Sequence, residues 1–252
     1  MSRLAVKSTI GNSFTELSSV SSTNIYAMDK VQANLAAHGA AFFAWEQTAG
    51  KGQMGKSWLA NKGENCLLSV VLDSSFLSIN QQFALSVVVA LAGYDCLSAY
   101  ISEELTIKWP NDLYWRDRKA AGILIENNLQ GNKWVWAIAG IGINVNQTEF
   151  PDLTKKAVSI KQITGNTFDP LVIANNFCGF LETRFNQLKN QGFDELLALF
   201  NDRLYKKGQT VKLRKNNIVG DYLIKSVNEF GELVVKAGIE NHFAHGSVEW
   251  IG

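Results

Sequence analysis

The sequence contains few of the residues that cross-link a fold through disulfides or bind metal ions. The 252 residues include only three cysteines, three histidines and three prolines. Cys66, Cys96 and Cys178 are odd in number, far apart and set in apolar surroundings, which is typical of buried thiols and excludes a disulfide framework. His242 and His245 stand close together, but two ligands without partners are more typical of a surface turn than of a metal site.

An excess of charge and a long apolar run are absent as well. Lys plus Arg total 24 against 23 for Asp plus Glu, so no basic field favours nucleic acid or an anionic membrane. The longest apolar stretch, residues 83–97, is too short and too interrupted to span a bilayer, and the first ten residues lack the apolar run of a secretory signal. We expect a cytoplasmic protein.

What is present is enough apolar sequence, 46% of the residues, for one large core. Periodicity and breaker residues predict helices over 25–38 and 79–101, a helical pair over 171–205, and strands over 40–47, 66–73 and 133–146. Runs 106–115 and 119–126 flank a polar turn, which predicts a hairpin. The polar stretch 147–169 is the segment most expected to be flexible.

The pattern changes after Gly208 to short β-rich runs, at 210–213, 218–227, 232–236 and 248–251. Such runs, separated by Asn and Gly, are typical of a small barrel. We therefore expect two domains, 1–206 and 207–252.

The segment AGKGQMGKS, residues 49–57, fits two phosphate-binding patterns, the G-x-G-x-x-G of dinucleotide folds and the G-x-x-x-x-G-K-[ST] of P-loop proteins. Both patterns need a helix directly after the glycines, and here a loop and then a strand follow. A glycine-rich loop between two strands can still offer backbone amides to an anion, with Lys51 and Lys56 adding charge, but an ordinary surface turn has the same composition.

Four segments favour an anion-binding loop over a surface turn. Together, and in the order in which they occur in the chain, they resemble the biotin protein ligases. They are Ser22-Thr23-Asn24 at a helix start, the glycine loop 47–58, KWPNDLY (108–114) running into DRKAAGILIE (117–126), and GIGIN (140–144). KWPND followed seven residues later by the lysine of K-x-A-G is a specific signature. The resemblance implies an α/β fold, a mixed β-sheet with packed helices (biotin/lipoate ligase, class II synthetase-like), followed by a small SH3-like β-barrel.

The resemblance also implies a reaction: biotin and ATP with Mg²⁺ give biotinyl-5′-AMP and pyrophosphate, and a lysine of a biotin carboxyl carrier domain then takes the biotinyl group. It assigns Lys119 and Asp112 to catalysis, with Asp112 also near the metal. The positions that match biotin contacts are Ser22, Thr23, Asn24, Gln47, Gly50, Lys51, Lys119, Gly140 and Gly142. Those that match ATP or adenylate contacts are Lys51, Gly52, Gln53, Lys56, Trp58, Lys108, Asn111 and Asn144.

Two departures from the family pattern have consequences. Lys51, Gln53 and Met54 stand where some members have loop arginines, so we expect a weaker hold on the adenylate, testable by the effect of Gln53→Arg on its off-rate. About twenty residues precede Ser22, too few for a helix-turn-helix domain, so we expect no repressor function.

Alternatives stay open at this point. A lipoate or octanoate protein ligase shares the fold and the acyl-adenylate chemistry, although its R-R-x-x-G-G-G-type segment is absent. A non-catalytic biotin-binding module is the other alternative, but Lys119 and Asp112 would then have no catalytic role. The resemblance also leaves a homodimer open.

Overall fold

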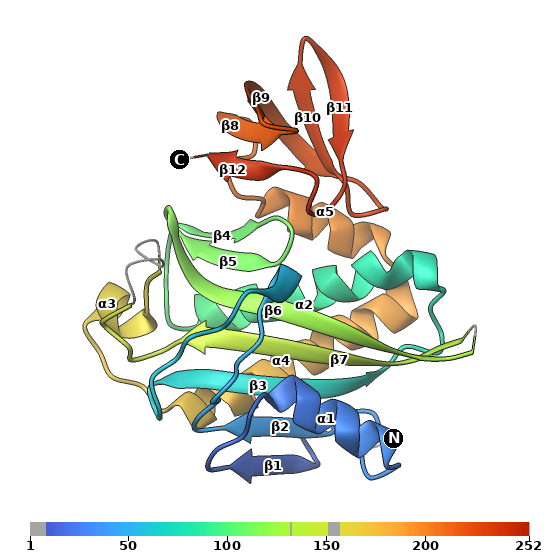
Figure 1. The fold of residues 1–252 in the computed structure, drawn as a ribbon, viewed down its shortest axis with the longest axis vertical. Coiled ribbons are helices and arrows are strands. Elements are labelled where there is room, and N and C mark those ends of the chain that lie inside the picture. Colours follow the sequence, from blue (N-terminus) through green and yellow to red (C-terminus); the bar gives the residue numbers. More distant parts are fainter. Residues whose placement is uncertain (1–8, 132, 151–156, 252) are drawn as a thin grey trace, which may run out of the picture.

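A computed structural model describes residues 9–131, 133–150 and 157–251, and its main body is a mixed sheet of seven strands (Figure 1). The strand order is β1-β2-β3-β7-β6-β5-β4, and only β1 and β2 pair in parallel. The strands are β1 (Phe14–Leu17), β2 (Ala41–Ala44), β3 (Asn65–Asp73), β4 (Leu105–Lys108), β5 (Asp112–Trp115), β6 (Arg118–Gln130) and β7 (Lys133–Asn144).

Helices cover both faces of this sheet, so strand residues alternate between two cores. The helices are α1 (Thr23–Gln32), α2 (Gln82–Ser98), α3 (Ile160–Thr164), α4 (Pro170–Gln191) and α5 (Asp194–Asp202), with the short turns η1 (Gln53–Gly55) and η2 (Ile79–Gln81). In Figure 1, α2 and α4 lie behind the sheet, while α1 and the chain segment that contains η1 lie in front of it. Val70 and Ile141 face the large core with α2 and α4, whereas Val71 and Ile138 face α1.

The period of two along each strand therefore decides which residues reach the face where α1 lies. On β7, Gly140 and Gly142 share the side of Ile138, and Ser69 on β3 shares the side of Val71. On β6, Gly122 pairs with Gly142. This places small and polar residues together on one face beside the N-terminus of α1.

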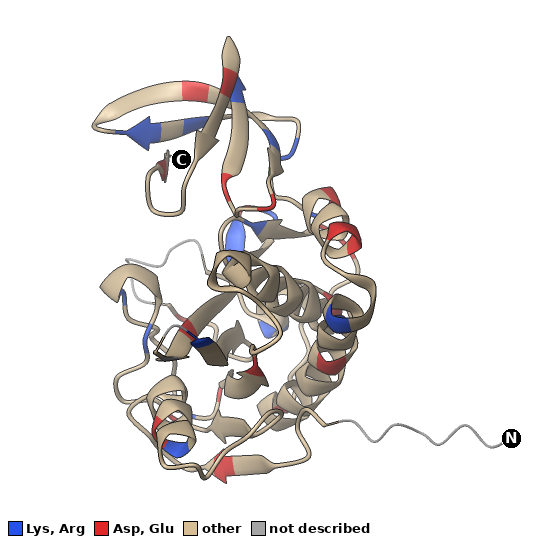
Figure 2. Cartoon of the chain, turned by 90° about the vertical axis from the view of Figure 1, so that its right-hand side faces the viewer, with Lys and Arg blue, Asp and Glu red and all other residues tan. Residues whose placement is uncertain are grey.

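The C-terminal part forms a second, antiparallel sheet of five strands in the order β11-β10-β9-β8-β12. These are β8 (Thr210–Lys215), β9 (Ile218–Val227), β10 (Leu233–Ala237), β11 (Ile239–Phe243) and β12 (Glu249–Ile251). Asn216 and Asn217, both at positive φ, turn β8 into β9 in the manner of a two-residue hairpin. Figure 2 shows this sheet at one end of the molecule, with acidic and basic residues interspersed along the described chain.

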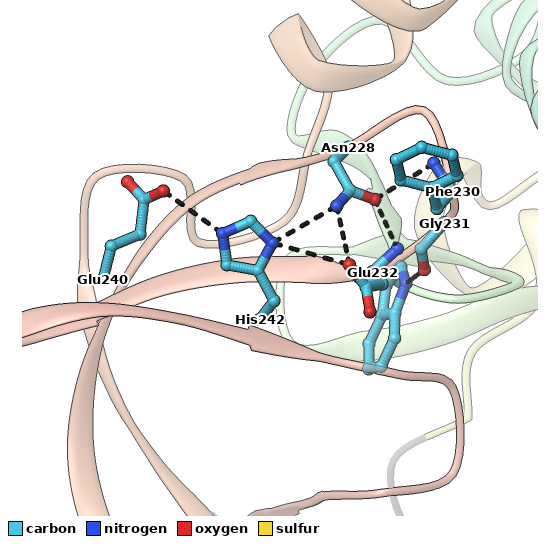
Figure 3. A network of polar contacts seen from close by, with 7 residues as sticks. Asn228, Phe230, Gly231, Glu232, Glu240 and His242 are labelled. Atoms are coloured by element: carbon cyan, nitrogen blue, oxygen red, sulfur yellow. Dashed lines mark hydrogen bonds and ion pairs between the residues drawn. The ribbon is translucent and has the colours of Figure 1, made fainter.

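A network around the β9–β10 turn shapes the junction between the two sheets (Figure 3). Asn228 Oδ1 accepts the backbone N–H groups of Phe230 and Glu232, at 3.1 and 2.9 Å. The turn presents the Gly231 carbonyl to the indole N–H of Trp109, at 2.9 Å. The five-stranded sheet is thus hydrogen-bonded to the loop that carries the K-W-P-N-D sequence.

His242 and His245, which the sequence placed in a surface turn, occupy two different positions. His242 lies on β11, where its ring nitrogens are 3.2 Å from Glu240 Oε1 and 3.5 Å from Glu232 Oε2 (Figure 3). His245 lies in the loop after β11 and packs edge-on against Trp109, with the ring centroids 6.2 Å apart. Burial lowers the pKa of His245. Only His245 fits the predicted loop position.

Most element predictions are confirmed, and the exceptions have local causes. The helix expected over 25–38 ends at Gln32, and Asn34 adopts a positive φ. The run 106–115 splits into β4 and β5 because Pro110, which has no N–H, interrupts the ladder. Strands β1 and β11 were not predicted.

In the polar stretch 147–169, residues 151–156 lie outside the described residues, and the rest carries α3, capped by Ser159 and Gln162. The mixed sheet with packed helices and the β-rich C-terminal unit are confirmed. No helix among the described residues is long and apolar enough to cross a membrane.

Candidate active site

A narrow cavity lies between the N-terminus of α1, the glycine loop and the exposed face of β6 and β7. Its lining contains twelve of the residues that the sequence singled out: Ser22, Thr23, Asn24, Gln47, Lys51, Gly52, Gln53, Trp58, Asn111, Lys119, Gly140 and Gly142. Segments more than a hundred residues apart in the chain therefore meet at one place. Gly122 and Leu124 on β6 line the same cavity.

Buried polar side chains form one end of the cavity. Thr23 donates its backbone N–H and its hydroxyl to Gln47 Oε1, at 2.8 and 3.0 Å. Ser69 Oγ lies 2.7 Å from Thr23 Oγ1 and 2.6 Å from Asn24 Oδ1. The Asn24 oxygen can only accept, so Ser69 donates to it, and Ser69 is also the donor toward Thr23 Oγ1; the two hydroxyl hydrogens of Thr23 and Ser69 therefore serve three contacts.

This end has fewer hydrogen-bond donors than its acceptors could use, and it is almost fully buried. Ser22, Thr23 and Asn24 expose 1%, 4% and 3% of their surface, and Ser69 exposes none. Buried polar groups are costly unless they are hydrogen-bonded. A ligand group that carries both donors and acceptors would complete the network.

Glycines leave the floor of the cavity bare. A Cβ atom on Gly140 would lie 2.2 Å from Asn24 Oδ1, and one on Gly142 would lie 2.4 Å from the Trp58 indole. A Cβ on Gly122 would lie 2.8 Å from the same indole and 2.9 Å from Lys119 Nζ. Only glycine at these three strand positions lets the side chains above approach the sheet this closely.

The indole of Trp58 fills the space over Gly122 and Gly142, and the Asn24 side chain covers Gly140. The remaining cavity measures about 50 Å³, whereas pockets for small molecules usually hold several hundred. The indole Nε1 is buried and has no hydrogen-bond partner among the described residues. On its other side Trp58 borders a second, open cavity of about 590 Å³ between the glycine loop and residues 147–150. Trp58 therefore stands between the narrow cavity and the open one.

Two lysines at the cavity each face a carboxylate. Lys119 Nζ lies 2.7 Å from Asp112 Oδ1, with the two side chains 31% and 21% exposed. Lys51 Nζ lies 3.3 Å from Glu126 Oε1, with 44% and 32% exposed. Lys119 is the second residue of β6, beside a register shift in the pairing with β5, the strand that carries Asp112. The site can thus present two cations to an anion, each held in place by an acid.

The remaining candidate residues lie around the cavity rather than on its lining. Lys108 Nζ sits over the rings of Tyr114, Tyr205 and Trp250, 4.5, 5.3 and 5.0 Å from their centroids, and so joins the two sheets. Burial, with Asp112 and Asp117 nearby, raises the pKa of Tyr114.

Lys56 is exposed, Gly50 lines the second cavity, and Asp112 reaches the first cavity through Lys119. Asn144 supports the site from behind, since its Nδ2 donates to the backbone carbonyls of Lys119 and Val158 at 3.2 Å each.

Sequence reasoning missed three residues of the site. Ser69 is the only polar residue between Asn65 and Asp73 on β3, and that isolation was the available signal. Gly122 and Glu126 stood inside a quoted motif without being singled out. Among the described residues, no group of three or more His, Cys, Asp or Glu side chains could hold a metal ion.

The glycine loop lacks the helix that both phosphate-binding patterns need. It contains only the single turn η1, with Met54 at φ 54°, and no helix follows Ser57 before β3 begins at Asn65. Lys51 and Ser57 form an isolated bridge across the loop. The prediction that this is a strand-loop-strand element is confirmed.

Comparison with known proteins places the chain in a family. The model of the biotin/lipoate A/B protein ligase family matches residues 16–144. The bifunctional ligase/repressor BirA of Bacillus spizizenii is 29% identical over 197 residues, 77% of this chain and 60% of that protein. The biotin–[acetyl-CoA-carboxylase] ligase of Paracoccus denitrificans is 31% identical over 207 residues, 77% of this chain and 82% of that protein.

Among solved structures, the biotin protein ligase from Aquifex aeolicus in complex with biotin and ATP superposes with a TM-score of 0.80 at 24% identity, covering 94% of this chain and 98% of that one. The fold prediction is therefore confirmed, although the chain spans only about 60% of the length of the Bacillus relatives. With a matched model over half its length and a 31% identical relative, the chain belongs to the biotin/lipoate A/B protein ligase family.

Proposed function

We propose that the chain is a biotin protein ligase. It forms biotinyl-5′-AMP from biotin and ATP with release of pyrophosphate, and then transfers the biotinyl group to a lysine of a biotin carboxyl carrier domain. The observation that carries the proposal is the glycine-floored cavity with a buried polar end and Lys119 at its side. The relatives named as biotin ligases, and the structure with biotin and ATP bound, support it.

The polar end suits the ureido ring of biotin. A ureido group has two N–H donors and one carbonyl acceptor, and the network of Thr23, Asn24, Gln47 and Ser69 offers hydroxyl and amide groups of both kinds. Ser22 lines the same cavity. The glycine floor at Gly122 and Gly142 leaves space for the ring system once the Trp58 indole swings away.

Lys119 and Lys51 lie at the other end of the cavity, where they bind the negatively charged groups of the substrates. In the first step a carboxylate oxygen of biotin attacks the α-phosphorus of ATP and pyrophosphate leaves, so two anions must come together. Lys119 neutralises them in the transition state, and Asp112 holds its ammonium in place. In the second step the acceptor amine attacks the acyl carbon and AMP leaves.

Mg²⁺ fits this site only as a companion of the nucleotide. Magnesium in proteins is usually held by one or two carboxylates together with substrate phosphates. Asp112, which is paired with Lys119, would be such a carboxylate, and the described residues contain no larger cluster of acids. The glycine loop, with Lys51, Gly52 and Gln53, covers the nucleotide side, and Trp58 packs beside the adenylate.

Residues 1–206 form the catalytic domain and 207–252 a C-terminal domain.

The test is an adenylation assay with a matched lysine control. Purified protein is incubated with ATP, Mg²⁺ and biotin, lipoate or octanoate, and pyrophosphate and the acyl-AMP are measured. Lys119→Met should lower biotinyl-AMP formation about 100-fold, as expected for loss of a charge that stabilises the transition state. Lys62→Met removes an exposed lysine that is paired to Glu46, and it should leave the rate unchanged.

Each other result would overturn part of the proposal. Turnover with lipoate or octanoate and not with biotin would make the chain a lipoate or octanoate protein ligase. Biotin binding without pyrophosphate release would make it a non-catalytic module.

A further inference from the structure

Glu126 connects the two ends of the cavity, although its own role is not fixed by the proposed chemistry. It lies on β6 at the face of α1, opposite Ile138 of β7. Its Oε2 accepts Asn24 Nδ2 at 2.8 Å, and its Oε1 lies 3.3 Å from Lys51 Nζ. One carboxylate thus touches both the buried polar end and the glycine loop.

On the buried side, Glu126 decides which way the Asn24 amide faces. The NH₂ group of Asn24 donates to Glu126 and, at 3.3 Å, to the Leu124 carbonyl, so its oxygen must point to Ser69. The two ends of an amide have nearly the same size and shape, and only hydrogen-bond partners tell them apart. A charged acceptor gives the stronger preference.

On the loop side, Glu126 supplies a side-chain tie between the glycine loop and the sheet. The loop is closed on itself by the Lys51–Ser57 bridge and by the bond from Gly52 N–H to the Lys56 carbonyl at 2.6 Å. Those contacts fix the shape of the loop but not its distance from β6. The Lys51–Glu126 ion pair does join it to β6, and Lys51 lines the cavity.

We propose that Glu126 is a positioning residue that orients Asn24 for the ureido group and, through Lys51, holds the glycine loop down over the acyl-adenylate. This inference rests on the proposed function and adds to it a residue that touches neither reacting atom. If Glu126 served only the stability of the fold, its removal would change the melting temperature and leave the loop and the adenylate untouched.

Glu126→Gln separates the two contacts, because glutamine still offers an oxygen to Asn24 but no charge to Lys51. The matched control is Glu46→Gln, which breaks a Lys–Glu pair of similar exposure, 34% for Glu46, at 3.5 Å. We expect Glu126→Gln to speed biotinyl-AMP release about fivefold, the range of a half-exposed ion pair, and to raise KM for ATP with kcat little changed. Glu46→Gln should do neither.

A double-mutant cycle with Lys51→Met tests the connection. If Glu126 acts through Lys51, the double variant releases the adenylate no faster than Lys51→Met alone. Additive effects, or a Glu126→Gln release rate equal to that of Glu46→Gln, would overturn the proposal.

A second readout needs no ligand and keeps this inference separate from the proposed function. Tryptic cleavage within residues 50–57 should be several-fold faster in Glu126→Gln than in the wild type or Glu46→Gln. If the wild type forms no adenylate, the proposed function fails, and the cleavage rate still decides whether Glu126 holds the loop. Equal cleavage rates in all three proteins would refute that role.

Discussion

Gly140→Ala is the substitution whose effect follows most directly from the site. The new methyl group would lie 2.2 Å from Asn24 Oδ1, 3.0 Å from its Cγ and 3.1 Å from the Leu124 carbonyl oxygen. Real carbon and oxygen atoms do not approach within 3.0 Å in this way. Asn24 is 3% exposed and cannot turn out to solvent, so either its side chain or β7 must shift by close to an ångström.

Such a shift disrupts two hydrogen bonds of Asn24. The bond from Ser69 is neutral and contributes about 1 kcal/mol, and the bond to the Glu126 carboxylate contributes about 1.5–3 kcal/mol. We therefore expect the free energy of unfolding to fall by about 2–4 kcal/mol, which lowers the melting temperature by roughly 5–10 °C in a chain of this length. Biotin affinity should fall at least about tenfold, since the amide no longer faces the ligand correctly.

Gly179→Ala is the matched control. Gly179 lies in α4, and a Cβ there would meet nothing within 4 Å. Alanine in an open helical position should raise stability by about 0.5–1 kcal/mol. Calorimetric melting and isothermal titration with biotin compare the two variants. A Gly140→Ala protein that melts and binds biotin like Gly179→Ala would refute the assignment of Gly140 to the floor of the pocket.

Two further predictions concern residues away from the cavity. Burial raises the pKa of Cys96 and of Cys178 to about 12 and that of Cys66 well above its usual value, so no thiol should react with Ellman's reagent at pH 8 until the chain unfolds. These thiols ionise near pH 9 only when unfolded, so their contribution to stability is complete below pH 9 and is lost as the pH rises toward 12, which urea midpoints across that range should show. Trp109→Phe removes the indole N–H that binds the Gly231 carbonyl and should cost about 1 kcal/mol in urea unfolding. An unchanged urea midpoint would mean that this bond does not hold the two sheets together.

The sequence predicted which distant segments come together at the site, but it did not predict the side-chain contacts between them. Twelve candidate residues line one cavity because a motif match assigns residues to a common site without any knowledge of the chain path. Ser69 escaped because a single serine in an apolar strand looks like a tolerated substitution until its partners are known. The position of the Trp58 indole over Gly122 and Gly142 depends on packing, which periodicity does not report.

The secondary structure shows the same division. Long strands with alternating faces and the strongly apolar helix α2 were predictable, because period and length agree over many residues. Strand β11 was not, since only Gly238 separates it from β10 and no polar cluster marks the turn. Lys108 stands in the most specific motif, yet its ammonium lies among three aromatic rings between the sheets.

The lysine–carboxylate pairs explain how a glycine loop without a helix can serve an anion. A P-loop uses the amides and dipole of a helix N-terminus, which are fixed and always positive. Here the positive charge comes from Lys51 and Lys119, and Glu126 and Asp112 balance it, so these four groups carry no net charge. Holding two ammonium groups near each other without partners would be unfavourable, and the acids remove that cost. An arriving carboxylate or phosphate must compete with Glu126 and Asp112 for the two lysines.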